Sequence, residues 1–247
     1  MFRRYGFKLL AVLLFIVVAV FGRQVCRIII FAKKADVTVK PFERNIPGAR
    51  LKILFFGDST AVGTGSKSNS QSVAGRFGRD FPQAEIVNIS QNGKKIHGLV
   101  RDFLPLVGGH YDLAVVQIGA NDIMWLTPLS NIERDLSIVV ENIKKSADHV
   151  VILHSGNVGL APIFSWPFDQ WLAARSRAVR ALYMKKAQEL GVLYVDLFRE
   201  RDDDLFLKDI PRYYAPDGLH PGGDGYGWWY EKIRSTLKNS NLELSAL

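Results

Sequence analysis

The chain has 247 residues, of which 48% are hydrophobic and 23% are charged, so disorder along its whole length is excluded. This length suits about one domain with a full hydrophobic core. A single cysteine, Cys26, excludes both an intrachain disulfide and a zinc site built on a cysteine cluster.

The net charge of +8 is concentrated at the N-terminus. Residues 1–52 hold 11 basic and two acidic side chains, a net charge of +9, whereas residues 53–247 hold 21 basic and 22 acidic ones, a net charge of −1. A body without excess positive charge argues against a nucleic-acid partner.

Residues 1–32 are predicted to be an uncleaved signal anchor. Three basic residues precede the apolar run LLAVLLFIVVAVFG at residues 9–22, and no small-x-small cleavage site follows it. The run covers roughly 21 Å of a hydrocarbon core of about 30 Å, so flanking Lys and Arg side chains must extend it by snorkelling. The alternative is a buried core helix, which is disfavoured because the first recognisable strand starts only at Leu51.

The orientation of this single-pass anchor is not fixed by charge, because basic residues flank the apolar run on both sides. A short tail before a first signal-like segment usually stays inside the cell. We therefore expect the rest of the chain to be extracytoplasmic or periplasmic. Residues 33–50, with several charges and two prolines, predict a basic linker that can lie against anionic headgroups.

Residues 51–247 alternate between strand and helix patterns. Apolar runs predict strands over 51–56, 85–89, 112–118, 149–153 and 192–197, and helical spacing predicts helices over 72–81, 96–106, 130–146, 170–190 and 224–237. This alternation predicts an α/β fold, a three-layer α/β/α sandwich around a mainly parallel five-stranded sheet. Ligands bind such sheets beyond the carboxyl ends of the strands.

Polar segments stand where such a site is expected. They follow the first three strands and precede the last helix, as Gly57-Asp58-Ser59-Thr60, Asn88 to Gly93, Gly119-Ala120-Asn121-Asp122 and Asp217-Gly218-Leu219-His220. A serine, a glycine with a free backbone donor, an asparagine and an Asp/His pair are the groups that acyl transfer needs.

These segments, read as GDS, N-x4-G, GxND and DxxH in that order, resemble the SGNH hydrolases, also called the GDSL esterase/lipase family. The resemblance covers about residues 51–239, leaves the N-terminal arm out, and implies the flavodoxin-like SGNH hydrolase fold. Thr60 stands where leucine is common in the family, at a position outside the chemistry.

The resemblance also implies roles for individual residues. Ser59 would be the nucleophile, His220 the general base, and Asp217 the group that orients His220. The oxyanion hole would be formed by the backbone N–H groups of Ser59 and Gly93 and by the side-chain amide of Asn121. No metal ion or cofactor is expected.

Aromatic residues are candidates for contacts with the substrate. Trp166, Trp171 and Tyr214 are assigned to substrate binding, with packing over the sheet edge as an equally weighted alternative. Trp228 and Trp229, on the last predicted helix, are assigned to packing.

Together these features predict a membrane-anchored serine esterase that hydrolyses carboxylic esters: lipid esters, short acyl esters or O-acetylated glycans. One alternative is an acyltransferase with glycan or lipid acceptors. Another is a non-catalytic binding module on the same fold, against which the complete set of catalytic residue types argues.

Overall fold

The computed structural model describes residues 2–35, 37–240 and 242. The predicted anchor, linker and hydrolase domain each include positions outside the described residues. These are residue 1 of the anchor, residue 36 of the linker, and residues 241 and 243–247 of the hydrolase domain.

The centre of the body is a sheet in which every pair of neighbouring strands is parallel. Its strands are β1 (Lys52–Gly57), β2 (Glu85–Ser90), β3 (Tyr111–Gln117), β4 (Ala147–Leu153) and β5 (Leu193–Tyr194), in the order β2-β1-β3-β4-β5. The last residue of β1, Gly57, is in register with Ser90 at the end of β2 and Gln117 at the end of β3. The segments that follow these three strands therefore emerge at one edge of the sheet.

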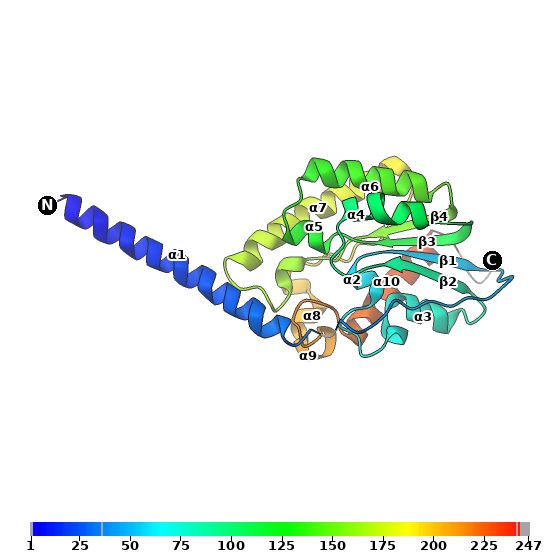
Figure 1. The fold of residues 1–247 in the computed structure, drawn as a ribbon, viewed down its shortest axis with the longest axis horizontal. Helices are drawn as coiled ribbons and strands as arrows, with labels where there is room; N and C mark the ends of the chain where they lie inside the picture. The colour runs from blue at the N-terminus through cyan, green and yellow to red at the C-terminus, as the bar shows by residue number, and fades with distance from the viewer. Residues whose placement is uncertain (1, 36, 241, 243–247) are drawn as a thin grey trace.

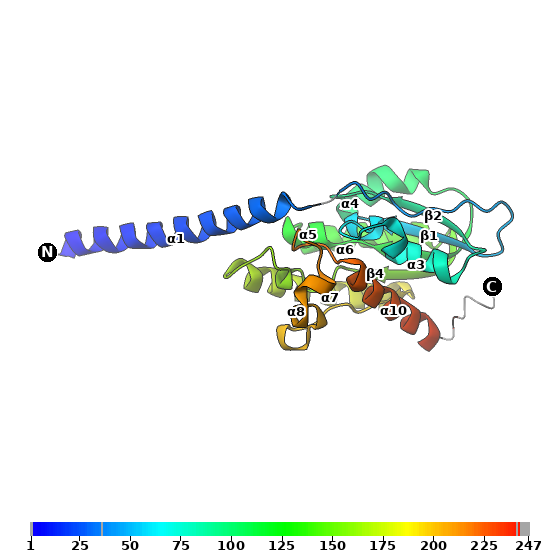
Figure 2. The ribbon, with the colours of Figure 1, turned by 90° about the horizontal axis from the view of Figure 1, so that it is seen from below.

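Helices cover both faces of the sheet (Figures 1 and 2). α3 (Val73–Asp80) and α10 (Gly223–Asn239) lie on one face, and α6 (Leu129–Ile143) and α7 (Phe168–Leu190) lie on the other. Each helix buries its apolar side against the sheet, which gives one hydrophobic cluster per face. The predicted three-layer α/β/α sandwich is confirmed.

The predicted helix over residues 96–106 is irregular. It consists of α4 (Ile96–Gly98), a π-helical segment η2 (Leu99–Phe103) and a 3₁₀ turn η3 (Leu104–Leu106). Pro105 has no backbone N–H with which to continue a regular α-helix, so a single periodic helix cannot cover the segment.

The predicted strand 192–197 is also shorter than expected. After Tyr194 the carboxylate of Asp196 accepts a hydrogen bond from the Phe198 N–H at 3.2 Å, and this local bond turns the chain away from the sheet.

Several short elements were not predicted. They are α2 (Ser59–Val62), η1 (Asn69–Gln71), α5 (Ala120–Met124), η4 (Val158–Leu160), η5 (Arg201–Asp203), α8 (Leu205–Lys208) and α9 (Ile210–Tyr213).

Helix α1 (Phe2–Ala32) projects away from the body (Figures 1 and 2). Its segment Leu10–Ala32 has a mean hydropathy of 2.2 and is long and apolar enough to cross a membrane. Most of this segment is exposed, so α1 is not a core helix. Past the helix, Arg44 pairs with Ile86 of β2 through two backbone hydrogen bonds, and so part of segment 33–50 packs against the body.

Candidate active site

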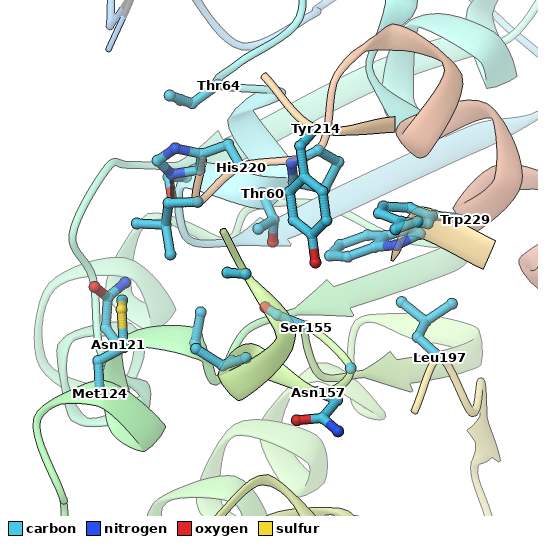
Figure 3. A pocket seen from close by; sticks show the side chains of 18 of the residues that line it. Thr60, Thr64, Asn121, Met124, Ser155, Asn157, Leu197, Tyr214, His220 and Trp229 are labelled. Carbon is cyan, nitrogen blue, oxygen red and sulfur yellow. Dashed lines mark hydrogen bonds between the residues drawn. The ribbon is translucent and has the colours of Figure 1, made fainter. Parts of the chain in front are cut away.

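A pocket of about 240 Å³ lies beyond the carboxyl ends of the strands. Five of the residues predicted to form the site line it: Ser59, Gly93, Asn121, Tyr214 and His220. Figure 3 shows His220, Thr60 and Tyr214 on one side of the pocket and Asn121, Met124 and Ser155 on the other. The sheet thus brings together segments that are up to 161 residues apart in sequence.

Ser59 is held at the start of the short helix α2, directly after β1. The side chain of Asp58 caps this helix by accepting hydrogen bonds from the Thr60 backbone N–H at 2.9 Å and from the Thr60 hydroxyl at 2.7 Å. Complete burial raises the pKa of Asp58 to about 6, although both hydrogen bonds act to lower it. A strong N-cap therefore fixes the backbone that presents the serine.

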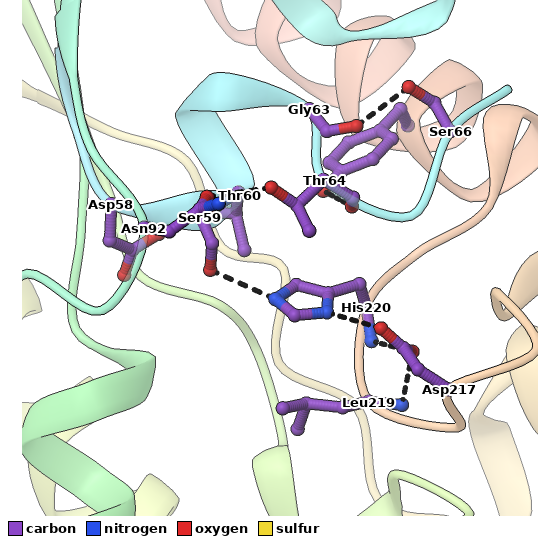
Figure 4. A network of polar contacts seen from close by, with 11 residues as sticks. Asp58, Ser59, Thr60, Gly63, Thr64, Ser66, Asn92, Asp217, Leu219 and His220 are labelled. Carbon is purple, nitrogen blue, oxygen red and sulfur yellow. Dashed lines mark hydrogen bonds and ion pairs between the residues drawn. The ribbon is translucent and has the colours of Figure 1, made fainter. Parts of the chain in front are cut away.

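Ser59, His220 and Asp217 form one chain of hydrogen bonds (Figure 4). The Oγ of Ser59 lies 3.0 Å from Nε2 of His220, and Nδ1 of His220 lies 2.6 Å from Oδ2 of Asp217. The other carboxylate oxygen, Oδ1, accepts backbone hydrogen bonds from Leu219 at 2.9 Å and from His220 at 3.0 Å. Both oxygens of the carboxylate thus accept hydrogen bonds that hold it in one orientation.

The environment of Asp217 favours its ionised form. Burial raises the pKa of this carboxyl, but the hydrogen bonds and charge of His220, together with the two backbone N–H donors, outweigh burial, and the net result is a lowered pKa. A carboxylate that stays charged keeps the proton of His220 on Nδ1 and leaves Nε2 free to accept a proton from a hydroxyl.

The three hydrogen-bond donors of the predicted oxyanion hole belong to the segments that follow β1, β2 and β3. Asn121, in the first turn of α5, uses Nδ2 to donate to the Lys94 carbonyl at 3.0 Å, which ties α5 to the loop that carries Gly93. Gly93 has a φ of +76°, a conformation that favours glycine, and within the described residues its N–H donates to no protein acceptor. The Ser59 N–H is one of the first N–H groups of α2, which have no partner within the helix.

Of the three aromatic residues predicted to contact the substrate, one lines the pocket and two do not. Tyr214 lines the pocket, whereas Trp166 and Trp171 are exposed and lie outside its lining. Trp228 and Trp229, which the sequence pattern assigned to packing, line the pocket as well as packing on the core. Helical spacing shows only that these two side chains face the sheet. The structure adds that α10 begins near the carboxyl ends of the strands, where the pocket lies.

Two further pocket residues lie in the segment from Ser155 to Asp169, which does not match the family pattern and which the sequence predicts to shape the pocket, although neither is predicted individually. Ser155 and Asn157 follow β4, and the hydroxyl of Ser155 and Oδ1 of Asn157 have no hydrogen-bond partner among the residues that the structure describes. Nδ2 of Asn157 donates to the Arg199 carbonyl at 3.0 Å, which fixes the direction of the side chain. Their placement after a strand is the signal by which they could have been found.

The described part of the chain contains no group of three or more His, Cys, Asp or Glu side chains arranged to hold a metal ion. What the pocket does contain is a hydroxyl next to an imidazole that a carboxylate orients, together with a set of donors. That arrangement suits nucleophilic acyl transfer.

Comparison with known proteins points the same way. The chain is 25% identical over 222 residues to the GDSL-like esterase Rv1075c of Mycobacterium tuberculosis, an alignment that covers 83% of this chain and 67% of that protein. Its fold is similar to that of an extracellular lipase from Streptomyces rimosus, with a TM-score of 0.59, 15% identity and coverage of 75% and 99% of the two chains. It is also similar to the acetyl xylan esterase AlAXEase, with a TM-score of 0.54, 20% identity and coverage of 76% and 100%.

The model of the GDSL-like Lipase/Acylhydrolase family matches residues 55–228, which include Ser59, Gly93, Asn121, Asp217 and His220. By this match the chain belongs to the GDSL-like lipase/acylhydrolase family of carboxylic ester hydrolases.

Proposed function

We propose that this protein is a membrane-anchored serine esterase in which Ser59, His220 and Asp217 form the catalytic triad. The observation that carries the proposal is the hydrogen-bond chain from Ser59 Oγ through His220 to Asp217, at 3.0 and 2.6 Å, at the wall of a pocket.

In the acylation step, Ser59 Oγ attacks the ester carbonyl carbon while its proton passes to Nε2 of His220. The Asp217 carboxylate stabilises the imidazolium ion that results. Collapse of the tetrahedral intermediate breaks the bond to the alcohol oxygen, which takes the proton from Nε2 and leaves as the alcohol. In the second step, water gives its proton to Nε2 as it attacks the acyl carbon. Collapse of the second tetrahedral intermediate breaks the bond to Ser59 Oγ, which takes the proton from Nε2, and the acid is released.

The negative charge of the two tetrahedral intermediates needs donors on the side away from His220. The N–H groups of Ser59 and Gly93 and Nδ2 of Asn121 supply them. Such donors each contribute about 2.7–4 kcal/mol to the transition state. Asn121 can serve in this way while it donates to Lys94, because an amide nitrogen carries two hydrogens.

The pocket favours a short acyl group. Its volume of about 240 Å³ lies below the 300–1,000 Å³ typical of sites for drug-sized ligands. Tyr214, Trp228 and Trp229 give it an aromatic wall, and Ser155 and Asn157 add polar side chains to its lining. Short acyl esters, including acetylated sugars, suit this combination.

We assign residues 1–32 to the anchor, 33–50 to the linker and 51–247 to the hydrolase domain, with that domain on the extracytoplasmic side. The support for the anchor is the apolar, mostly exposed segment Leu10–Ala32 with basic residues at both ends.

The decisive experiment is hydrolysis of p-nitrophenyl butyrate by the full chain and by Ser59→Ala. We expect loss of turnover by at least about 10³-fold, with an unchanged melting temperature. Ser70→Ala is the matched control, since this serine lies in an exposed turn outside the pocket. Turnover retained in Ser59→Ala would rule the mechanism out.

A further inference from the structure

Helix α1 is fixed to the body by a buried glutamine. Gln24 is only 4% exposed, although its neighbours on α1 face outward. Its Nε2 donates to the Ile163 carbonyl at 3.1 Å, and its Oε1 accepts from the Ser165 N–H and hydroxyl, both at 3.0 Å. Phe21 adds an edge-to-face contact with Phe168 at 5.1 Å between ring centroids. We call residues 162–168, which receive these contacts, the docking loop.

The docking loop is joined in turn to the segment that carries Asp217 and His220. The Ile163 N–H donates to the Gly218 carbonyl at 2.9 Å. Phe31 of α1 lies so close to Gly218 that a Cβ there would come within 2.6 Å of its ring. The direction of α1 is therefore set by contacts at the active-site end of the body, from which the helix projects outward (Figures 1 and 2).

The length of α1 decides how deep this end of the body must sit. Crossing a hydrocarbon core of about 30 Å takes about 20 helical residues. Before Phe21 makes its contact, only the 12 residues from Leu9 to Val20 are apolar, and they cover roughly 18 Å. The segment that is long and apolar enough to span, Leu10–Ala32, therefore includes Phe21 and Gln24, which contact the body. A spanning α1 thus carries the docking loop into the membrane interface.

The surface around the docking loop suits that position. Trp166 in the loop is 68% exposed, and Trp171 just after it is 53% exposed. Trp125, at the end of α5 and so at the same edge of the sheet, is 70% exposed. Tryptophan is enriched where a membrane protein meets the headgroups. The exposed Lys33 and Lys34, directly after α1, add positive charge suited to anionic headgroups.

From these observations we propose that the lipid bilayer covers this face of the protein. The docking loop, Trp171 and Trp125 lie in the headgroup layer, and the active-site pocket opens toward the membrane. The substrate is then an ester held in the bilayer surface. This inference rests on the proposed esterase function and on its anchor, and it adds the orientation of the site and the place from which the substrate comes.

The test uses the full chain in phosphatidylcholine–phosphatidylglycerol vesicles. Cys26 is exposed on α1 and is first replaced by serine. A bimane label is then attached to Trp166→Cys, to Trp125→Cys or, as a control, to Lys145→Cys, at the opposite edge of the sheet just before β4. Doxyl-labelled phosphatidylcholine should quench the labels at 166 and 125 and leave the label at 145 unquenched. Equal, weak quenching at all three positions would overturn the proposal.

A second measurement compares a vesicle-embedded fluorogenic ester with soluble p-nitrophenyl butyrate. Trp125→Glu should lower the ratio of the two turnover rates by about fivefold, because a carboxylate disfavours the interface. Met184→Glu, exposed far along α7, should leave the ratio unchanged. An unchanged ratio in Trp125→Glu would contradict the proposal. Soluble turnover that depends on Ser59 is read separately, so failure of the esterase function is distinguished from failure of this orientation.

Discussion

The substitution Asp217→Asn tests the triad through the tautomer of His220. Two backbone N–H groups, those of Leu219 and His220, donate to Oδ1 of Asp217. An asparagine therefore places its carbonyl oxygen toward these donors and its NH₂ group toward Nδ1 of His220. Two donors cannot bond to each other, so the imidazole must carry its proton on Nε2, where it can no longer accept the proton of Ser59.

The structure also bounds the magnitude. In a serine triad the wrong tautomer costs about 10⁴-fold in kcat, roughly 5.4 kcal/mol. If the asparagine amide flips, its oxygen faces Nδ1 of His220 and the correct tautomer is restored. The two backbone N–H groups then lose their acceptor, which costs about 1–3 kcal/mol each. The variant takes the less costly route, so kcat should fall by between about 30-fold and 10⁴-fold.

The assay is steady-state hydrolysis of p-nitrophenyl butyrate, with thermal melting as the check on folding. Asp112→Asn is the matched control, because Asp112 accepts a hydrogen bond from the Lys52 N–H at the opposite edge of the sheet. The control should keep kcat within about twofold of the parent. A loss of less than tenfold in Asp217→Asn would refute the role given to this carboxylate.

Three further predictions follow from the geometry and the pKa shifts. Asn121→Ala should lower kcat by about 10²–10³-fold through loss of an oxyanion donor, measured on the same ester. Asp58→Asn should stabilise the protein above pH 6 by up to about 3 kcal/mol in urea unfolding, and leave stability unchanged below pH 4, since burial of the charged carboxylate raises the pKa of Asp58 to about 6. Burial lowers the pKa of His154 to about 4, so the unfolded chain binds a proton near pH 6.5 while the folded one does not, and stability should fall as the pH drops from 6.5 to 4. His154→Asn, which keeps an acceptor for the Gly156 N–H, should remove about 3 kcal/mol of that decline.

Each of these predictions has an outcome that contradicts it. An unchanged kcat in Asn121→Ala would remove this amide from the oxyanion hole. If the free energy of unfolding of Asp58→Asn differed from that of the parent by the same amount at pH 4 and at pH 8, ionisation of Asp58 would not destabilise the folded protein. An identical acid profile for His154→Asn and the parent would assign the loss of stability to other groups.

The sequence predicted the layers and the central residues of the site for a physical reason. Apolar runs such as residues 51–56 are buried on both sides of a parallel sheet, and helices such as α6 carry one apolar face, so both leave a periodic signal. Because Ser59 and Asn121 come directly after strands that end in register, their meeting follows from the topology alone.

Other features left no signal in the apolar pattern. The breakdown of the helix over residues 96–106 and the short β5 are local effects, of Pro105 and of a hydrogen bond of Asp196, that apolar periodicity does not register. The docking of Gln24 pairs a polar residue of α1 with a loop about 140 residues away, and nothing in the periodicity of either segment predicts it. The pocket-lining role of Trp229 depends in the same way on where α10 ends up.

The central claim is that Ser59 becomes acylated during turnover, and covalent labelling tests it most directly. The full chain is treated with a fluorophosphonate probe, digested, and sequenced by mass spectrometry, with and without excess p-nitrophenyl butyrate. We expect one labelled peptide with the adduct on Ser59, protected by the ester and absent from Ser59→Ala. Ester hydrolysis by a protein that is not labelled, or is labelled at another residue, would contradict the account.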